Sequence, residues 1–199
     1  MDRTTFMKAL GARLYPILRA NGFKGSGATL RRIKEPIVHV FNVQGSAGSA
    51  QCYLNLGAHL TFLPGAGGGQ IDVKNLKEYE CEFRGRYDPP AGEQFGWSYG
   101  QNEAEMNENI AFICDHWQMY GEAFFEKYSD FPADFVALIQ AVDAPATHPA
   151  KLLTLAKIAE RLGDHARSKT FAAEALTQCP EPDSGLHEAL QQFLRDVAD

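Results

Sequence analysis

Two arginines, Arg84 and Arg86, stand two residues apart in the stretch ECEFRGRYDPP at residues 80–90. A β-strand turns successive side chains to opposite faces, so this spacing places both guanidinium groups on one face and Phe83 and Tyr87 on the other. A guanidinium group can donate paired hydrogen bonds to a carboxylate or a phosphate. The pattern therefore predicts a polar strand face that is able to bind an anion.

The same stretch also offers an explanation that needs no ligand. Glu78, Glu80 and Glu82 fall on the same predicted strand face as the two arginines. Opposite charges two residues apart in a strand, or on the neighbouring strand, lie within reach of each other. Salt bridges inside the protein are therefore the alternative to a ligand site, and the sequence leaves both open.

Other polar side chains in predicted strands could face the same cleft, and amides near strand ends can instead satisfy stray backbone groups. His39 alternates with apolar residues, and we expect both His39 and His59 to be core imidazoles with satisfied hydrogen bonds rather than an acid or a base. The candidate ligand-binding residues are Arg84, Arg86, Asn42, Gln44, Asn55 and His59. No catalytic residue is predicted.

The cysteines carry no metal-binding or redox spacing. The four of them, Cys52, Cys81, Cys114 and Cys179, form no Cys-x-x-Cys pair and lie among apolar neighbours, which predicts reduced core thiols. A zinc site built from Cys52, Cys81, His39 and His59 is geometrically conceivable because all four fall in predicted strands, but the tight ligand spacing of such sites is missing. The prediction is no metal and no cofactor.

The bulk composition narrows the class of protein. With 199 residues, 45% of them hydrophobic and 22% charged, the chain has the composition of an ordinary globular protein. A net charge of −6 argues against binding to nucleic acid, which requires clustered lysines and arginines. No continuous apolar segment predicts a signal peptide or a membrane span. We therefore expect a cytoplasmic protein without nucleic-acid or membrane partners.

Hydrophobic periodicity predicts an α+β fold. An N-terminal helix ends at Asn21-Gly22 and is kinked or broken at Pro16, and a long helix runs from a capping residue, Asn102, to about Tyr128. The predicted strands are residues 28–35, 37–44, 51–63 and 78–87, with a short fifth at 95–100, and residues 22–27 are predicted to be a flexible connector. The result is a mostly antiparallel sheet of four or five strands, packed by the long helix.

The C-terminal part of the sequence is helical. The stretch DAPATHP at residues 143–149 predicts a boundary between an α+β domain, 1–142, and a helical extension, 147–199, whose first helix is capped by Thr147. Beyond it, LTLAKIAERLGDHARSKTFAAEALTQCP resembles a single tetratricopeptide unit, with Ser168 where that family usually has alanine. A single repeat cannot bury its own face, so we expect it to pack on the first domain or on another molecule.

Four short motifs carry a resemblance to a family. LYPILRANGFKGSGATLRR, VFNVQGS, CYLNLGAHL and CEFRGRYDPP resemble the bacterial domain-of-unknown-function family 4304 over about residues 5–125. That family has a helix ending in Gly-Phe, then Asn-x-Gln, Asn-Leu-Gly and Cys-x-x-Arg-x-Arg strands. The positions that match its pattern are Gly22, Phe23, Asn42, Gln44, Asn55, Gly57, Arg84, Arg86 and Trp97. The resemblance implies a fold and no activity.

Two functional hypotheses follow. The first is a non-enzymatic module that binds another protein, because the chain is small and acidic, lacks a catalytic constellation, and carries a helical repeat of a kind used for protein contacts. Neutralisation of a basic toxic enzyme is one specific form of this hypothesis, since the acidic charge would complement it. The alternative is a small-molecule or anion site around Arg84 and Arg86, with or without enzymatic activity.

Overall fold

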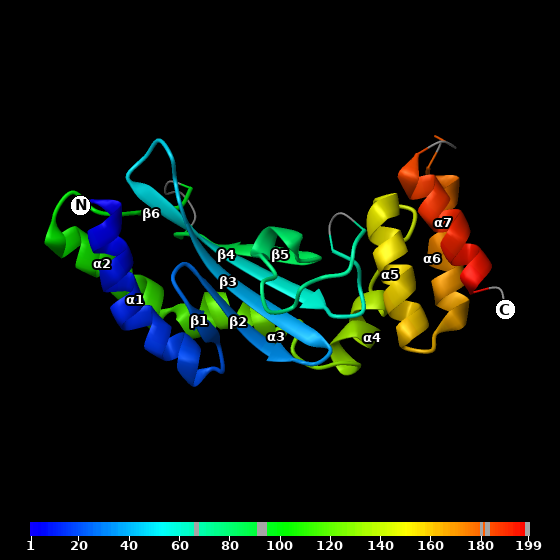
Figure 1. The fold of residues 1–199 in the computed structure, drawn as a ribbon, viewed down its shortest axis with the longest axis horizontal. Helices are drawn as coiled ribbons and strands as arrows, with labels where there is room; N and C mark the ends of the chain where they lie inside the picture. The colour runs from blue at the N-terminus through cyan, green and yellow to red at the C-terminus, as the bar shows by residue number, and fades with distance from the viewer. Residues whose placement is uncertain (66–67, 91–94, 180, 182–183, 198–199) are drawn as a thin grey trace. The chain divides into compact units, whose positions relative to one another are not determined.

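The computed structural model describes residues 1–65, 68–90, 95–179, 181 and 184–197. The chain divides into two compact units, residues 1–129 and residues 130–199. The first unit combines helices with an antiparallel sheet and the second is helical, which confirms the predicted α+β class (Figure 1). The division lies between Ser129 and Asp130, whereas the sequence analysis places it at 143–149.

The sheet of the first unit is an antiparallel meander. Its strands are β1 (Lys24–Ser26), β2 (Thr29–Lys34), β3 (Ile37–Gly45), β4 (Gln51–Leu60), β5 (Phe83–Tyr87) and β6 (Trp97–Ser98). Strands β1 to β5 are neighbours in chain order, and β6 pairs with the start of β4. The sheet has one strand more than the predicted maximum of five, because residues 24–26 of the supposed flexible connector pair with β2.

The stretch from Glu78 to Tyr87 is a strand only in its second half. Residues Glu78–Glu80 form a 3-10 turn, η1, and β5 begins at Phe83. The carboxylate of Glu80 accepts a hydrogen bond of 2.7 Å from the backbone N–H of Lys77, which stabilises the turn. The prediction of a strand across 78–87 is therefore wrong in its first half, and Glu78 and Glu80 do not lie on the strand.

One face of the sheet, called the inner face here, forms the main core. Leu30, Phe41 and Leu56 are paired across β2, β3 and β4 and are fully or almost fully buried. They belong to the same apolar cluster as Phe6 and Leu10 of helix α1 (Arg3–Ala20). Helix α1 continues through its internal proline, so it is not broken in two. Burial of each such side chain stabilises the fold by about 1.5–3 kcal/mol.

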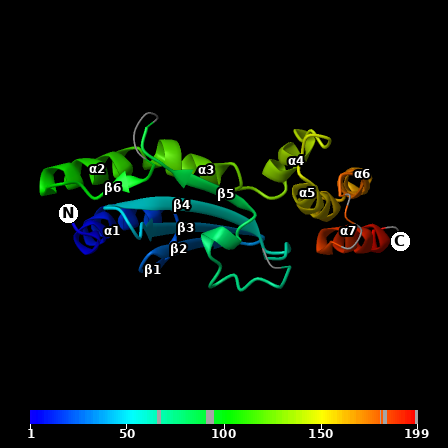
Figure 2. The ribbon, with the colours of Figure 1, turned by 90° about the horizontal axis from the view of Figure 1, so that it is seen from above.

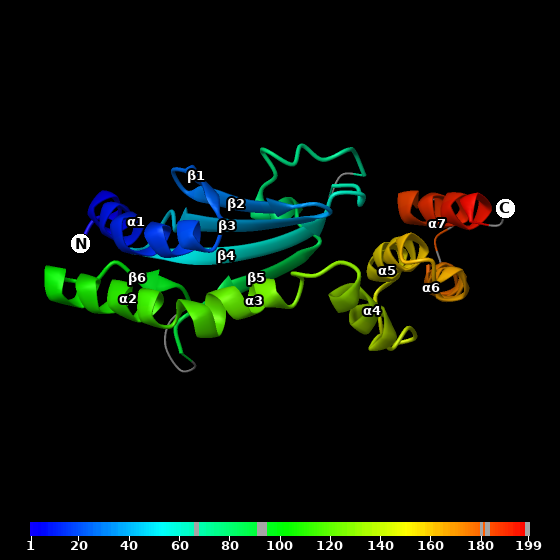
Figure 3. The same cartoon turned by 90° about the horizontal axis from the view of Figure 1, so that it is seen from below.

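The long helix predicted after Asn102 is interrupted. The side chain of Asn102 accepts a hydrogen bond from the N–H of Glu105, as the capping pattern predicts. Helix α2 (Glu103–Asp115) is followed by a π-helical turn, η2 (Gln118–Glu122), and by the short helix α3 (Ala123–Glu126). Figure 2 and Figure 3 show these helices along one face of the sheet, with the segment between β4 and β5 on the opposite face.

Close packing accompanies the π turn. A Cβ atom on Gly121 would lie 2.4 Å from the ring of Trp117, so only glycine fits where the backbone passes the indole. The wider turn changes the direction in which the following side chains point, and Glu122 is buried although it is charged. The prediction of one continuous helix is thus wrong at the position that faces the sheet.

The second unit contains four helices among its described residues. They are α4 (Ala133–Gln140), α5 (Pro149–Arg161), α6 (His165–Thr177) and α7 (Gly185–Asp196). Helix α5 is capped by His148, which accepts a hydrogen bond from the N–H of Ala150, and not by the predicted Thr147. Helices α5 and α6 pack together and are joined by a turn in which Gly163 has a φ of 80° and Asp164 caps α6.

Candidate functional site

The outer face of the sheet carries a continuous row of polar side chains. Thr29, Asn42, Asn55 and Arg86 are paired in register across β2, β3, β4 and β5. Asn42 Nδ2 donates to Thr29 Oγ1 at 2.9 Å, and Asn55 Nδ2 donates to Asn42 Oδ1 at 3.4 Å. Arg86 Nε donates to Asn55 Oδ1 at 3.3 Å. Each member therefore orients the next, and the row ends at a guanidinium group.

Asn55 is the centre of this row. Its side chain is 7% exposed, and its Nδ2 also donates to Gln44 Oε1 at 3.0 Å. Both amide hydrogens and the amide oxygen have partners, so the buried amide has satisfied hydrogen bonds and a fixed orientation. Four of the six predicted site residues, Asn42, Gln44, Asn55 and Arg86, are thus joined by hydrogen bonds.

A hollow of about 450 Å³ opens beside the row, and we call it the Arg84 groove. It is lined by Gln44, Asn55, Leu56, Glu78, Tyr79, Arg84, Gly85 and Arg86. The volume falls within the range of small-molecule sites in proteins. The 3-10 turn η1 contributes Glu78 and Tyr79, and Tyr79 is 62% exposed. Tyr79 is not among the predicted site residues, because the strand pattern over 78–87 does not indicate the turn that brings it to the groove.

The two arginines of the groove differ in how they are held. The Arg86 guanidinium group lies 4.5 Å from the centre of the Tyr53 ring, in addition to its bond to Asn55. The side chain of Arg84 is exposed and makes no hydrogen bond or ion pair with any residue that the structure describes. The predicted internal salt bridges to Glu78 and Glu80 are absent among the described residues, and the donors of Arg84 stay available.

His59 does not line the Arg84 groove. Its side chain is 1% exposed, because the segment before β5 covers this part of the outer face. Its Nδ1 accepts from the backbone N–H of Glu82 at 3.1 Å, and its Nε2 lies 3.3 Å from the carbonyl oxygen of Leu63. Burial lowers the pKa of the imidazole. His59 is therefore a core histidine with both ring nitrogens bonded, as one of the two interpretations of the sequence predicts.

Gly57 explains how the covering segment can approach so closely. It is two residues from Asn55 on the same strand face, where a Cβ atom would lie 2.7 Å from Cys81 Sγ and 3.2 Å from the Cα of Glu78. Only a glycine lets η1 pack against β4 and form one wall of the Arg84 groove.

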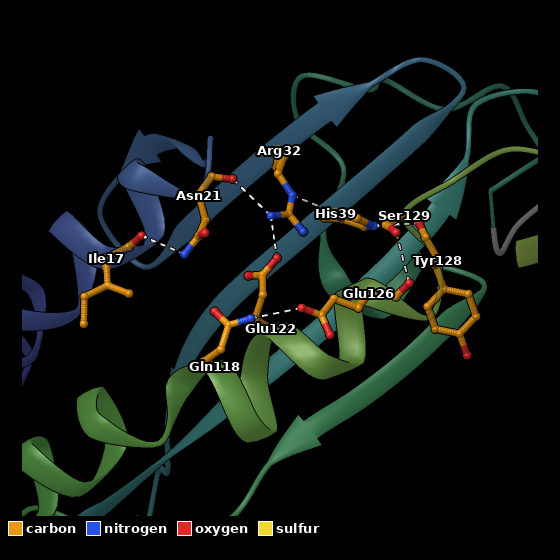
Figure 4. Close-up of polar contacts among 9 residues, drawn as sticks. All are labelled: Ile17, Asn21, Arg32, His39, Gln118, Glu122, Glu126, Tyr128 and Ser129. Carbon is orange, nitrogen blue, oxygen red and sulfur yellow. Dashed lines mark hydrogen bonds and ion pairs between the residues drawn. The ribbon is translucent and has the colours of Figure 1, made fainter.

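The inner face holds a buried charged cluster that the sequence did not predict (Figure 4). Arg32 Nη1 donates to Glu122 Oε1 at 2.6 Å and to the carbonyl oxygen of Asn21 at 3.0 Å. Arg32 Nε donates to His39 Nδ1 at 3.0 Å. The Arg32 guanidinium group also lies 4.7 Å from the ring of Phe23. The cluster joins β2, β3, the end of α1 and the π turn.

The tautomer of His39 follows from its neighbours. Arg32 Nε can only donate, so His39 Nδ1 must accept, and the proton is on Nε2, which donates to the carbonyl oxygen of Tyr128 at 2.9 Å. Burial, opposed in part by this bond to Tyr128, lowers the pKa of His39 to about 4. His39 is therefore neutral, and both of its ring nitrogens are hydrogen-bonded. It orients the Arg32 side chain and is not available as an acid or a base.

Two of the four cysteines are buried in the core of the first unit. Cys52 and Cys81 are buried free thiols, and burial raises the pKa of each to about 12, so both are protonated at neutral pH. Within the described part of the chain, no group of three or more His, Cys, Asp or Glu side chains is placed to hold a metal ion.

No helix among the residues that the structure describes is both long enough and apolar enough to cross a membrane.

Comparison with known families identifies a family whose sequence model matches this chain. The sequence model of a family described as "Domain of unknown function (DUF4304)" matches residues 14–127, which is more than half of the 199 residues. The match covers the sheet, the Arg84 groove and the charged cluster. No curated protein and no solved structure matches the chain.

Proposed function

The chain belongs to the DUF4304 family, and because that description assigns no activity, we propose from the geometry of the Arg84 groove that the protein binds a ligand bearing a carboxylate or a phosphate group. The observation that carries this proposal is the guanidinium group of Arg84, which has no polar partner among the described residues. It stands two residues from Arg86, on the same strand face, in a hollow large enough for a small molecule.

Arg86 is held in one orientation by its neighbours, so we expect it to fix the position of the bound anion. Its Nε is bonded to Asn55 and its plane is held near the Tyr53 ring, which leaves the terminal nitrogens of the guanidinium group for a ligand. A fixed guanidinium group loses less conformational entropy on binding than a mobile one. Arg84 then supplies a second, adaptable set of donors.

Glu78 limits which anions fit. Glu78 lines the same groove as the two arginines, so a phosphate group, which is close to doubly charged at neutral pH, would meet more repulsion at one wall than a carboxylate. A ligand with one anionic group and a hydrogen-bond donor satisfies both walls. The exposed ring of Tyr79 offers an apolar surface to the rest of such a ligand.

The test is a binding titration of the full chain with small carboxylates and phosphate monoesters, including amino acids and glycerol phosphate. We expect saturable binding that is lost in the double variant Arg84→Gln/Arg86→Gln. The matched control is Lys8→Gln/Lys169→Gln, which removes two positive charges at exposed positions in α1 and α6 and should bind like the wild type. Equal binding by both double variants would exclude the Arg84 groove as the site.

A second candidate function is contact with another protein through the helical unit. It is supported by the packed pair α5 and α6, the arrangement that helical repeats use for protein contacts, and by the net charge of −6, which suits a basic partner such as a toxic enzyme. The four free cysteines are consistent with a reducing, cytoplasmic location for either function. Glu174→Lys on α6 separates the two functions, because it would weaken capture of a basic protein and leave small-anion binding intact.

A further inference from the structure

A second hollow, of about 640 Å³, lies at the β1–β2 end of the sheet, and we call it the basic groove. Its lining residues are Gly22, Lys24, Gly25, Arg31, Arg32, Ile33, Lys34 and Lys74. Five of these eight are basic, and none of the described residues that line it is acidic. This concentration of positive charge is unexpected in a chain of net charge −6.

The two arginines of the basic groove are already oriented. Arg31 Nε donates to the carbonyl oxygen of Leu76 at 2.7 Å, and this is the only bond that its side chain makes with the described residues. Arg32 uses Nε and Nη1 in the charged cluster, and its Nη2 has no partner in the described part of the chain. Both side chains are therefore held in place while terminal N–H donors stay free.

Three lysines from three separate segments also line the basic groove. Lys24 comes from β1, Lys34 from the end of β2, and Lys74 from the segment between β4 and β5. All three are exposed, and none forms a hydrogen bond or an ion pair with its side chain within the described ranges. Of the five basic residues that line the groove, only Arg32 forms an ion pair with a described residue, Glu122, so the like charges of the other four repel one another unless an anion binds.

Two glycines keep the basic groove open. Gly22 and Gly25 have φ angles of 87° and 130°, which other residues rarely adopt. A Cβ atom on Gly25 would also lie 2.9 Å from the carbonyl oxygen of Thr29, and one on Gly22 would lie 3.5 Å from Arg32 Cδ. A side chain at Gly25 would therefore distort β1, and one at Gly22 would strain the backbone beside Arg32.

We propose that the basic groove binds a small molecule carrying two or more linked phosphate groups, such as a condensed or an organic polyphosphate. Five cations around one hollow exceed what a single phosphate or carboxylate needs, and the volume suits a ligand of that size. A nucleic acid fits less well, because none of the described lining residues is an aromatic that could stack on a base, and the rest of the chain is acidic. This site is distinct from the Arg84 groove and shares no described lining residue with it.

The test is calorimetric titration of the full chain with tripolyphosphate, compared with orthophosphate, in about 0.15 M salt so that weak surface attraction is screened. We expect tripolyphosphate to bind, orthophosphate to bind at least about tenfold more weakly, and Lys24→Gln/Lys74→Gln to weaken tripolyphosphate binding by about tenfold. The control Lys8→Gln/Lys169→Gln should change the affinity by less than about twofold.

Each other outcome contradicts the proposal. Absence of tripolyphosphate binding at millimolar concentration overturns it, and so does equal binding by the lysine variant and the control. Orthophosphate binding as tight as tripolyphosphate overturns the requirement for linked phosphates. Binding that is lost in Arg84→Gln/Arg86→Gln and kept in Lys24→Gln/Lys74→Gln assigns the anion to the Arg84 groove instead. As a control for folding, the thermal unfolding midpoint of every variant is measured and compared with that of the wild type.

Discussion

Arg32 and Arg86 are each fixed through Nε by a neighbouring side chain, but they lie on opposite faces of the same sheet. On the inner face, Arg32 is one-fifth exposed, packs near two phenylalanine rings and gives Nη1 to the buried carboxylate of Glu122. On the outer face, Arg86 is exposed and gives a single donor to Asn55. A guanidinium group that is paired with a buried acid makes the fold depend on that acid, whereas one with open donors can bind a ligand.

The largest expected effect tests the inner side of this comparison. Glu122→Gln removes the carboxylate that faces Arg32 at 2.6 Å and leaves a desolvated guanidinium group without a counter-charge. We expect a loss of about 3 kcal/mol in the free energy of unfolding, measured by urea denaturation. The matched control Glu126→Gln, one turn further along at an exposed position, should cost less than about 0.5 kcal/mol. Equal costs for the two variants would show that Arg32 does not need Glu122 as its counter-charge in the folded protein.

The second prediction is the pH dependence of the same cluster. His39 has a pKa of about 4 in the folded protein and an ordinary value of 6.5 when unfolded. The unfolded chain therefore binds more protons between these two values, so stability is complete above pH 6.5 and is lost as the pH falls towards 4. At pH 5 the loss attributable to His39 is about 2 kcal/mol relative to pH 8.

Comparison with His39→Gln isolates this contribution, because the other titratable groups are the same in both proteins. The unfolding free energy of the wild type should fall by about 2 kcal/mol more than that of His39→Gln between pH 8 and pH 5. Parallel pH profiles for the two proteins would contradict the buried, neutral state of His39.

The sequence predicts the outer face better than the inner cluster, for a physical reason. The positions of Arg84, Arg86, Asn42 and Gln44 follow from the period of two along a strand, which is a local property. The strand assignment failed at Glu78–Glu80, where a carboxylate bond to the backbone of Lys77 favours a turn. Strand period alone could not show that a separate segment would cover His59.

The charged cluster around Arg32 could not be predicted from local sequence patterns, because its members are far apart in the chain. Glu122 is 90 residues from Arg32, and it points at the sheet only because a π turn interrupts the helical period that the apolar stripe predicts. Gly121 beside Trp117 is the one local signal, since a glycine inside a predicted helix marks a position where a side chain does not fit. His39 on an apolar strand face shows that a polar partner is required, without identifying it.

The third prediction tests how the outer face is built. Gly57→Ala places a Cβ atom 2.7 Å from Cys81 Sγ and 3.2 Å from the backbone of Glu78, so η1 must move away from β4. We expect a destabilisation of about 2 kcal/mol and weaker anion binding in the Arg84 groove, because one of its walls shifts. Gly48→Ala is the control, since a Cβ atom there would have no described atom within 4 Å. Unchanged binding by Gly57→Ala would mean that η1 is not part of the site.

The smallest expected effect on stability tests the outer side of the comparison. Arg84→Gln removes an exposed side chain that has no polar partner among the described residues, so the unfolding free energy should change by less than about 0.5 kcal/mol. Arg86→Gln should cost slightly more, because it also removes the contact with Tyr53 and leaves one acceptor of the buried Asn55 amide without its donor. Urea denaturation of the two single variants, each paired with a ligand titration, measures both effects.

Measuring both the unfolding free energy and the ligand affinity of the Arg84→Gln and Arg86→Gln variants distinguishes a binding site from an ordinary surface. If both are binding residues, Arg84→Gln reduces ligand affinity while leaving stability unchanged, and this separation is what a side chain with open donors should show. A loss of stability in Arg84→Gln comparable to that of Glu122→Gln would place Arg84 in an internal network, as Arg32 is, and the functional difference between the two faces of the sheet would disappear.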